Sequence, residues 1–77
     1  MNTGPDFETI GDARLCAWSL DEGTTRIQTN SGAIFKILCR FEGARRAGYA
    51  VAGHPFWLVD LPQKLSWVKK HVVEKLK

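Results

Sequence analysis

The first two thirds of the chain carry the period-two alternation of apolar and polar side chains that is typical of β-strands. Residues 14–20 form a short apolar-rich run that stops at the turn signal Asp21-Glu22-Gly23, although helix is the competing interpretation of this run. In residues 24–29 the β-branched side chains fall at every second position and predict a second strand. Asn30-Ser31-Gly32 then predicts a hairpin turn, because Asn and Gly tolerate the positive φ angles of such turns.

Residues 33–41 show the clearest alternation and predict the strongest strand of the sheet. One face of this strand is wholly apolar and predicts core positions at Phe35, Ile37, Cys39 and Phe41. A glycine-bounded loop is expected over 42–48, and residues 49–52 and 56–59 predict two further short strands.

The last part of the chain changes its period and predicts an amphipathic helix over 61–76. Its apolar residues recur at spacings of three and four and form one stripe: Leu61, Leu65, Val68, Val72 and Leu76. Asp60 is expected as the N-cap, with Gln63 three residues later as in a capping box. Because the stripe must be buried, we expect the helix to pack on the apolar face of the sheet.

These elements predict the α+β class, with an antiparallel sheet of four to five short strands packed against one C-terminal α-helix. The expected organisation is a single domain over 1–77, with a loose arm over 1–13, the sheet over 14–59 and the helix over 61–76. A chain of 77 residues lies near the lower end of what folds alone, so one compact core is feasible and a deep walled cleft is not.

The sequence carries no recognisable catalytic pattern. His54 and His71 stand apart from any nucleophile motif, paired carboxylates or metal-ligand cluster, and no glycine-rich phosphate loop is present. We therefore expect no enzymatic activity, no cofactor and no metal. Cys16 and Cys39 predict two reduced core thiols, with a cross-strand disulfide as the alternative.

Charge divides the chain into an acidic beginning and a basic remainder. Residues 1–23 hold five acidic side chains against Arg14 alone, whereas residues 61–77 hold five lysines against Glu74 alone. The formal net charge is +3. The basic side is suited to an acidic protein surface or a phosphate backbone, because long-range attraction follows such asymmetry.

Three groups of side chains are candidates for contact with a partner. The expected strand register places Arg26, Lys36 and Arg40 on the outward face of the sheet, the 42–48 loop carries Arg45 and Arg46, and the helix carries Trp67 and Lys70 opposite its apolar stripe. An exposed tryptophan among charged residues is typical of an interface. The alternative interpretations are ordinary solvated surfaces and, for Trp67, cover by the N-terminal arm.

The order of a hairpin, glycine-broken strands and then Phe56-Trp57-Leu58-Val59-Asp60-Leu61 leading into Trp67-Val68-Lys69-Lys70-His71 resembles small phage and prophage proteins, several anti-CRISPR inhibitors among them. The resemblance spans 14–77 at the level of architecture and carries no residue roles. It implies a sheet closed by one helix after an aromatic-Asp-Leu junction. It further implies a viral inhibitor that docks on a CRISPR effector subunit in the bacterial host cell and blocks access of target DNA.

We therefore expect a non-enzymatic binding protein from a mobile element, which inhibits a host protein or ribonucleoprotein defence complex by surface occlusion. The expected partner-binding set is Arg26, Lys36, Arg40, Arg45, Arg46, Trp67 and Lys70. The alternative is a small nucleic-acid-binding domain that uses the basic sheet face and loop. In a further variant of the inhibitor hypothesis, the acidic N-terminal third of the chain mimics phosphates and docks against DNA-binding lysines of the host. The polar N-terminus and the lack of a long apolar run predict a cytoplasmic protein without membrane contact. We expect it to be a monomer or a weak dimer.

Overall fold

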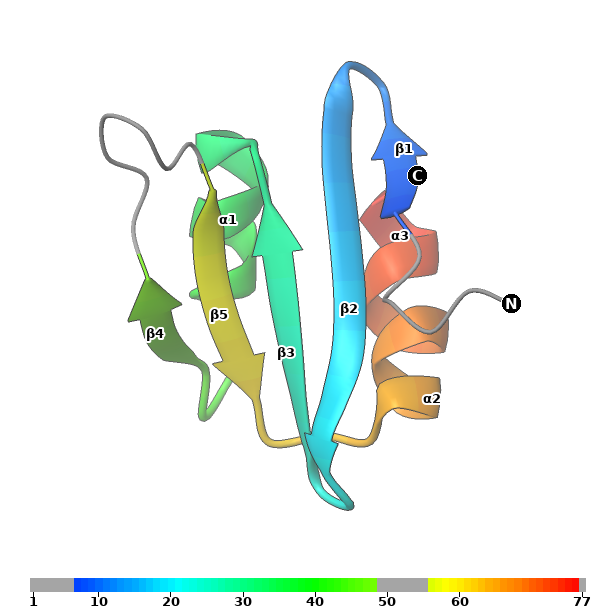
Figure 1. The fold of residues 1–77 in the computed structure, drawn as a ribbon, viewed down its shortest axis with the longest axis vertical. Helices are drawn as coiled ribbons and strands as arrows, with labels where there is room; N and C mark the ends of the chain where they lie inside the picture. Colours follow the sequence, from blue (N-terminus) through cyan, green and yellow to red (C-terminus); the bar gives the residue numbers. More distant parts are fainter. Residues whose placement is uncertain (1–6, 49–55, 77) are drawn as a thin grey trace.

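The computed structural model describes residues 7–48 and 56–76, which form one antiparallel sheet and two helical segments (Figure 1). The strand order is β1-β2-β3-β5-β4. The strands are β1 (Phe7–Ile10), β2 (Ala13–Asp21), β3 (Thr24–Thr29), β4 (Arg45–Gly48) and β5 (Trp57–Leu61). Helix α1 spans Gly32–Leu38, and the C-terminal helix runs through α2 (Leu65–Val68), η1 (Lys69–Val73) and α3 (Glu74–Leu76). The α+β class and the packing of the C-terminal helix on the sheet are confirmed.

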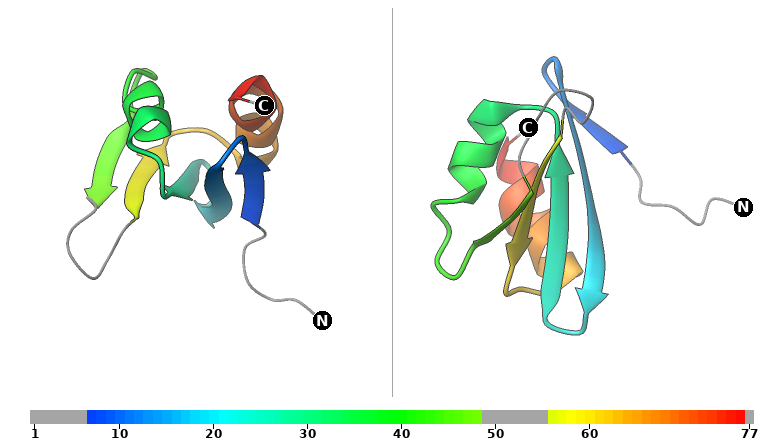
Figure 2. Two further views of the ribbon diagram at one scale, coloured as in Figure 1. Left: turned by 90° about the horizontal axis from the view of Figure 1, so that it is seen from above. Right: turned by 60° about the vertical axis from the view of Figure 1, so that its left-hand side comes forward.

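Both helical segments cover the same face of the sheet, which Figure 2 shows from above. The C-terminal helix lies over the β1–β2 side and α1 lies over the β5–β4 side. None of the described elements covers the opposite face. The core between the layers contains Leu15, Ile27, Ile34, Phe35, Leu38, Val59, Leu61, Val68, Val72 and Val73.

Strand β3 is the centre of the sheet and confirms the strand predicted over 24–29. It pairs with β2 and with β5, and its alternation buries Thr25, Ile27 and Thr29 under the helices. The two buried threonines satisfy their hydroxyls: Thr25 Oγ1 donates to the Gln63 carbonyl at 2.8 Å, and Thr29 Oγ1 donates to the Arg14 carbonyl at 2.9 Å. Buried polar groups need such partners. The bond from Thr25 to Gln63 also joins β3 to the segment before α2.

The segment 33–41, expected as the strongest strand, is instead helix α1 and its C-terminal extension. Ser31 is the N-cap, and its Oγ accepts a hydrogen bond from the Ile34 amide at 3.3 Å. The buried side chains are Ile34, Phe35 and Leu38, a helical spacing, whereas Ile37 is 40% exposed. The prediction was wrong because Lys36 is the single polar residue between 33 and 39, so the run fits both the strand period and the helix period. The N-cap at Ser31 then favours the helix.

The C-terminal helix begins four residues later than expected. Asp60 and Leu61 belong to β5, where they pair with Arg26 and Thr25, so Asp60 is not the N-cap. Lys64 occupies the N-cap position and makes no side-chain cap hydrogen bond. Val68, Val72 and Val73 are fully buried.

The adjacent buried valines coincide with a π-helical turn, η1. In an ideal α-helix, consecutive side chains are separated by about 100° and cannot both point straight at one layer. The wider turn over Lys69–Val73 brings Val72 and Val73 to 1% and 0% exposure. Of the other members of the predicted stripe, Leu65 and Leu76 are half-buried and Leu61 is buried on β5.

Four further expectations have separate outcomes. The predicted loop over 42–48 ends in strand β4, which contains Arg45 and Arg46. The predicted loose arm contains strand β1 from Phe7, while residues 1–6 lie outside the described ranges. The strand predicted over 49–52 also lies outside them, and the one predicted over 56–59 is β5 at 57–61.

Candidate functional site

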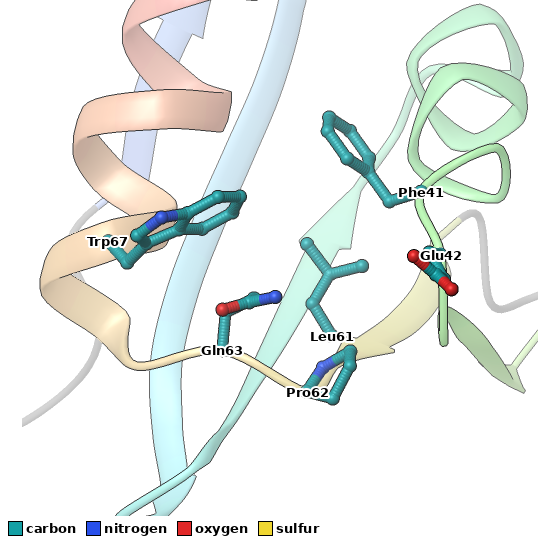
Figure 3. A pocket seen from close by; sticks show the side chains of 6 residues that line it. All are labelled: Phe41, Glu42, Leu61, Pro62, Gln63 and Trp67. Atoms are coloured by element: carbon teal, nitrogen blue, oxygen red, sulfur yellow. The ribbon is translucent and has the colours of Figure 1, made fainter.

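A pocket opens to solvent between the two helical segments, on the helix-bearing face of the molecule (Figure 3). We call it the inter-helix pocket. It has a volume of about 220 Å³ and is lined by Phe41, Glu42, Leu61, Pro62, Gln63 and Trp67. These residues come from the segment after α1, the end of β5, the segment between β5 and α2, and the first turn of the C-terminal helix, so the site exists only in the folded chain.

Two aromatic side chains form the walls of the inter-helix pocket. Trp67 and Phe41 point toward one another across it, and Leu61 forms its floor at 1% exposure (Figure 3). Trp67 is 37% exposed and stacks on His71 one turn later, with 4.8 Å between ring centroids. The stacking restrains the indole, so one aromatic face is presented to the pocket at little cost in side-chain entropy.

Polar groups occupy one end of the inter-helix pocket. Gln63 extends from the segment before α2, where its backbone carbonyl is held by Thr25 Oγ1, and Glu42 lies on the α1 side (Figure 3). Gly43 fixes the position of Glu42: its φ is +79°, and a Cβ there would lie 2.7 Å from Pro62 Cγ. Only glycine allows both this backbone conformation and this approach.

A shallow apolar hollow extends the pocket along α1. It is lined by Ile37, Arg40 and Phe41, so Phe41 contributes to both concavities. Ile37 and Trp67, two of the large exposed apolar side chains of the described residues, therefore line two concavities that share Phe41. Neighbouring exposed apolar side chains of this kind are typical of an interaction site.

The opposite side of the molecule, the open sheet face, carries a different arrangement. A row of directly opposed residues crosses four strands on this face: Trp18 on β2, Arg26 on β3, Asp60 on β5 and Arg45 on β4. Opposed residues in antiparallel pairs project to the same side, so the row forms one band.

The centre of this band is a bidentate ion pair. Arg26 Nε lies 2.8 Å from Asp60 Oδ1, and its Nη2 lies 3.0 Å from Oδ2. The hydrogen bond to Asp60 raises the pKa of the Arg26 guanidinium above its already high ordinary value, so Arg26 stays charged at every accessible pH. Cys16 lies on the same side of β2 as Trp18 but is buried, and that burial raises the pKa of its thiol.

The structure divides the predicted contact residues between the two faces. Arg26 and Arg45 project from the open sheet face, as their register shows. Lys36 and Arg40 do not join them, because they lie on α1 and just after it instead of on a strand. Arg46 is opposite Val59 and therefore projects toward the helix side, and Lys70 is exposed on η1. Trp67 is exposed, as expected from its position opposite the helix stripe.

Sequence reasoning missed three residues of the inter-helix pocket: Phe41, Glu42 and Gln63. Phe41 was assigned to the core of a strand and Gln63 to a capping box, both consequences of the two misplaced element boundaries. The one available signal was Glu42-Gly43, since a glycine directly after an acidic residue can hold it in a fixed turn.

Both cysteines are free thiols. Within residues 7–48 and 56–76, no three His, Cys, Asp or Glu side chains lie close enough together to hold a metal ion. Across the same ranges, no helix has the length and apolar character needed to cross a bilayer.

Comparisons with protein-family models, with curated proteins and with solved structures find no match for this chain. The resemblance to phage and prophage inhibitors therefore stays a prediction.

Proposed function

We propose that this protein is a non-enzymatic binding protein whose helix-bearing face docks on a partner protein. The observation that carries the proposal is the aromatic-walled inter-helix pocket, open to solvent beside the exposed Ile37. Its volume of about 220 Å³ is below the roughly 300–1,000 Å³ of small-molecule sites and suits one inserted side chain. Protein interfaces place their strongest contacts in such pockets, with tryptophan among the most enriched residues.

The charges around the helix-bearing face are consistent with the contacts expected from sequence. Lys36, Arg40 and Lys70 are exposed on or beside the helical segments that form the pocket, together with Trp67. A basic rim around an apolar centre speeds association with a partner of opposite charge and contributes less to final affinity. Trp67 and Phe41 are thus proposed as the anchors, and the basic residues as steering groups.

The resemblance to phage inhibitors extends this proposal to the partner. It favours a viral protein in the cytoplasm of a bacterial host that acts on a defence complex such as a CRISPR effector by surface occlusion. Inhibition by occlusion needs only a stable footprint, which a small domain without a catalytic site can supply.

A cleavage assay with purified, guide-loaded CRISPR effector complexes tests this function. We expect the intact chain to abolish target-DNA cleavage by at least one complex at saturating concentration. Trp67→Ala should weaken its inhibition about tenfold, since truncating an interface anchor costs more than 1 kcal/mol. Arg45→Glu, on the open sheet face, should inhibit like the intact chain. Full cleavage by every complex tested would remove the defence-complex assignment.

A second candidate function, nucleic-acid binding, is favoured by the open sheet face. Trp18 and the exposed Arg45 offer an aromatic face and a guanidinium group in the band that also contains the Arg26–Asp60 ion pair, and sheet-based single-strand binders combine such groups. A gel shift at 50 and 200 mM salt distinguishes it, because phosphate contacts release counterions and affinity then falls steeply with salt. The docking function predicts little binding to naked oligonucleotides, whereas the alternative predicts salt-sensitive binding that Arg45→Glu weakens and Trp67→Ala leaves unchanged.

A further inference from the structure

We infer that the inter-helix pocket accepts the guanidinium side chain of an arginine presented by the partner protein. This inference rests on the proposed docking function and names the chemical group that the docking surface recognises.

The lining of the inter-helix pocket is complementary to a cation. Trp67 and Phe41 extend toward each other from opposite walls (Figure 3), and the quadrupole of an aromatic ring attracts cations to its face, most strongly for tryptophan. Among the six described residues that line the pocket, Glu42 has the only charged side chain, and that charge is negative. Gln63 adds a side-chain amide to the lining. Aromatic walls with one carboxylate beside them suit a flat or elongated cation.

The arrangement suits arginine better than other cationic or apolar side chains. A guanidinium is planar, stacks on aromatic faces and pairs bidentately with a carboxylate, whereas a lysine ammonium is a strongly hydrated point charge. Leucine would fill the aromatic part but leave Glu42 and Gln63 facing an apolar group, which costs free energy when those groups lose water. An acidic side chain would be repelled by Glu42.

The pocket is held open before any partner arrives. Gly43 packs against Pro62 and fixes Glu42, Thr25 Oγ1 holds the Gln63 carbonyl at 2.8 Å, and His71 supports Trp67. A preorganised site avoids the ordering cost that otherwise reduces affinity. Arg40 is the basic residue among the three described residues that line the adjacent hollow, and it is not among the six described residues of the pocket itself.

NMR titration of the isolated chain tests the inference without the partner. The probes are capped seven-residue Gly/Ser peptides whose central residue is Arg, Lys, Leu or Glu. We expect the Arg peptide to bind in the millimolar range and shift the Trp67 indole N–H resonance, with Trp18 and Trp57 as internal controls. Lys should bind several-fold more weakly, and Leu and Glu should leave the spectrum unchanged.

Variants of the lining then separate the two contributions to recognition. Glu42→Gln should weaken binding of the Arg peptide about fivefold, which is the upper range for the loss of a solvent-accessible ion pair. It should also remove most of the preference for the Arg peptide over the Lys peptide. Trp67→Phe should keep binding and Trp67→Leu should lose it, while both variants keep the amide spectrum of a folded chain. Equal shifts from the Leu and Arg peptides, or unchanged Arg affinity in Glu42→Gln, would overturn the inference.

The partner assay separates failure of this inference from failure of the docking function. If Trp67→Ala weakens inhibition of a CRISPR effector and Glu42→Gln does not, docking stands and arginine recognition is wrong. If the Arg peptide binds as described and no effector is inhibited, the pocket chemistry stands and the defence-complex assignment is wrong.

Discussion

Ser31 is the residue that turns an ambiguous apolar run into a helix. Its Oγ accepts from the Ile34 amide at 3.3 Å, and its own amide donates to Thr29 Oγ1 at 3.1 Å, so the hydroxyls of Thr29 and Ser31 connect the end of β3 to the start of α1. Thr29 also donates to the Arg14 carbonyl on β2. Local side-chain hydrogen bonds of this kind compete with strand pairing and favour helix starts.

Removing this cap should therefore destabilise the protein. We expect Ser31→Ala to lower the free energy of unfolding by about 1 kcal/mol and Ser31→Asp to retain it, because Asp caps equally well. Urea denaturation followed by circular dichroism measures both. Ser66→Ala, the same chemical change at an exposed helix position, should shift stability by less than about 0.5 kcal/mol. Equal stability of Ser31→Ala and the intact chain would contradict the capping role.

Asp60 carries the second residue-level prediction. Its carboxylate accepts two hydrogen bonds from Arg26, and the side chain is only 17% exposed. Asp60→Asn keeps the shape of the side chain and removes its charge. We therefore expect the free energy of unfolding to fall by about 1–2 kcal/mol, a value between those for exposed ion pairs and for hydrogen bonds to buried charged groups. Asp12→Asn, an identical change in the exposed β1–β2 turn, should be neutral. Matching urea midpoints for the two variants would show that the ion pair contributes nothing.

The thiols should react in an order set by burial. Cys16 is 1% exposed and its thiol pKa is raised by desolvation, while Cys39 is half-buried at the C-cap of α1. Because the thiolate is the reactive species, iodoacetamide at neutral pH should modify Cys39 well before Cys16. Peptide mass spectrometry after timed quenching measures both rates, and urea should abolish the difference. Faster labelling of Cys16 in the native protein would contradict its burial.

At the level of elements, the C-terminal helix begins with a weak cap. Lys64 has the extended backbone of an N-cap but makes no side-chain cap bond, and its positive charge lies at the positive end of the helix dipole. Lys64→Ser should raise stability by about 0.5–1 kcal/mol. Lys70→Ser, a matched change in the exposed interior of the helix, should be neutral or slightly destabilising. Thermal unfolding followed by circular dichroism compares them, and a lower Tm for Lys64→Ser would contradict the assignment.

The elements that sequence predicted correctly are those whose local signals agree with their tertiary role. In β3, alternation, β-branched residues and the flanking turns all indicate the same strand, and the helix stripe of Val68 and Val72 is buried as periodicity predicts. Errors arose where one residue serves two roles. Asp60 suits an N-cap in isolation, but Arg26, a residue 34 positions earlier, uses its carboxylate in the sheet.

The candidate site shows the same limit. Trp67 could be identified from its place opposite an apolar stripe, because helix geometry is local. Phe41 and Gln63 could not, since Phe41 was assigned to a strand where the structure has helix α1 and Gln63 to a helix that begins only at Leu65. A concave site between elements depends on those ends, and boundaries are fixed by contacts distant in sequence, such as the approach of Gly43 to Pro62.

For the whole molecule, the Cα radius of gyration of 11.6 Å equals the value of about 11.5 Å expected for a compact domain of this length. Both helical segments bury their apolar sides on one sheet face and share one core: Leu38 from α1 and Val68 from α2 are each 0% exposed, and both segments contact the central strand β3. Neither helical segment has a separate core, so the loss of one exposes apolar surface under the other.

This shared core predicts one cooperative unfolding transition, which the tryptophans can report from different places. Trp57 packs against Phe35 of α1, at 5.8 Å between ring centroids, and Trp67 stands on the C-terminal helix. Two variants test this, each of which keeps one of these tryptophans and has Phe at the other two tryptophan positions. In each variant, the urea midpoint from fluorescence should coincide with the midpoint from far-ultraviolet circular dichroism, as two-state behaviour requires. Comparing both probes within one variant removes the effect of the substitutions on stability. A Trp57 midpoint below that of circular dichroism would show that α1 and its side of the inter-helix pocket detach first, and the pocket would then be a site that partner binding completes.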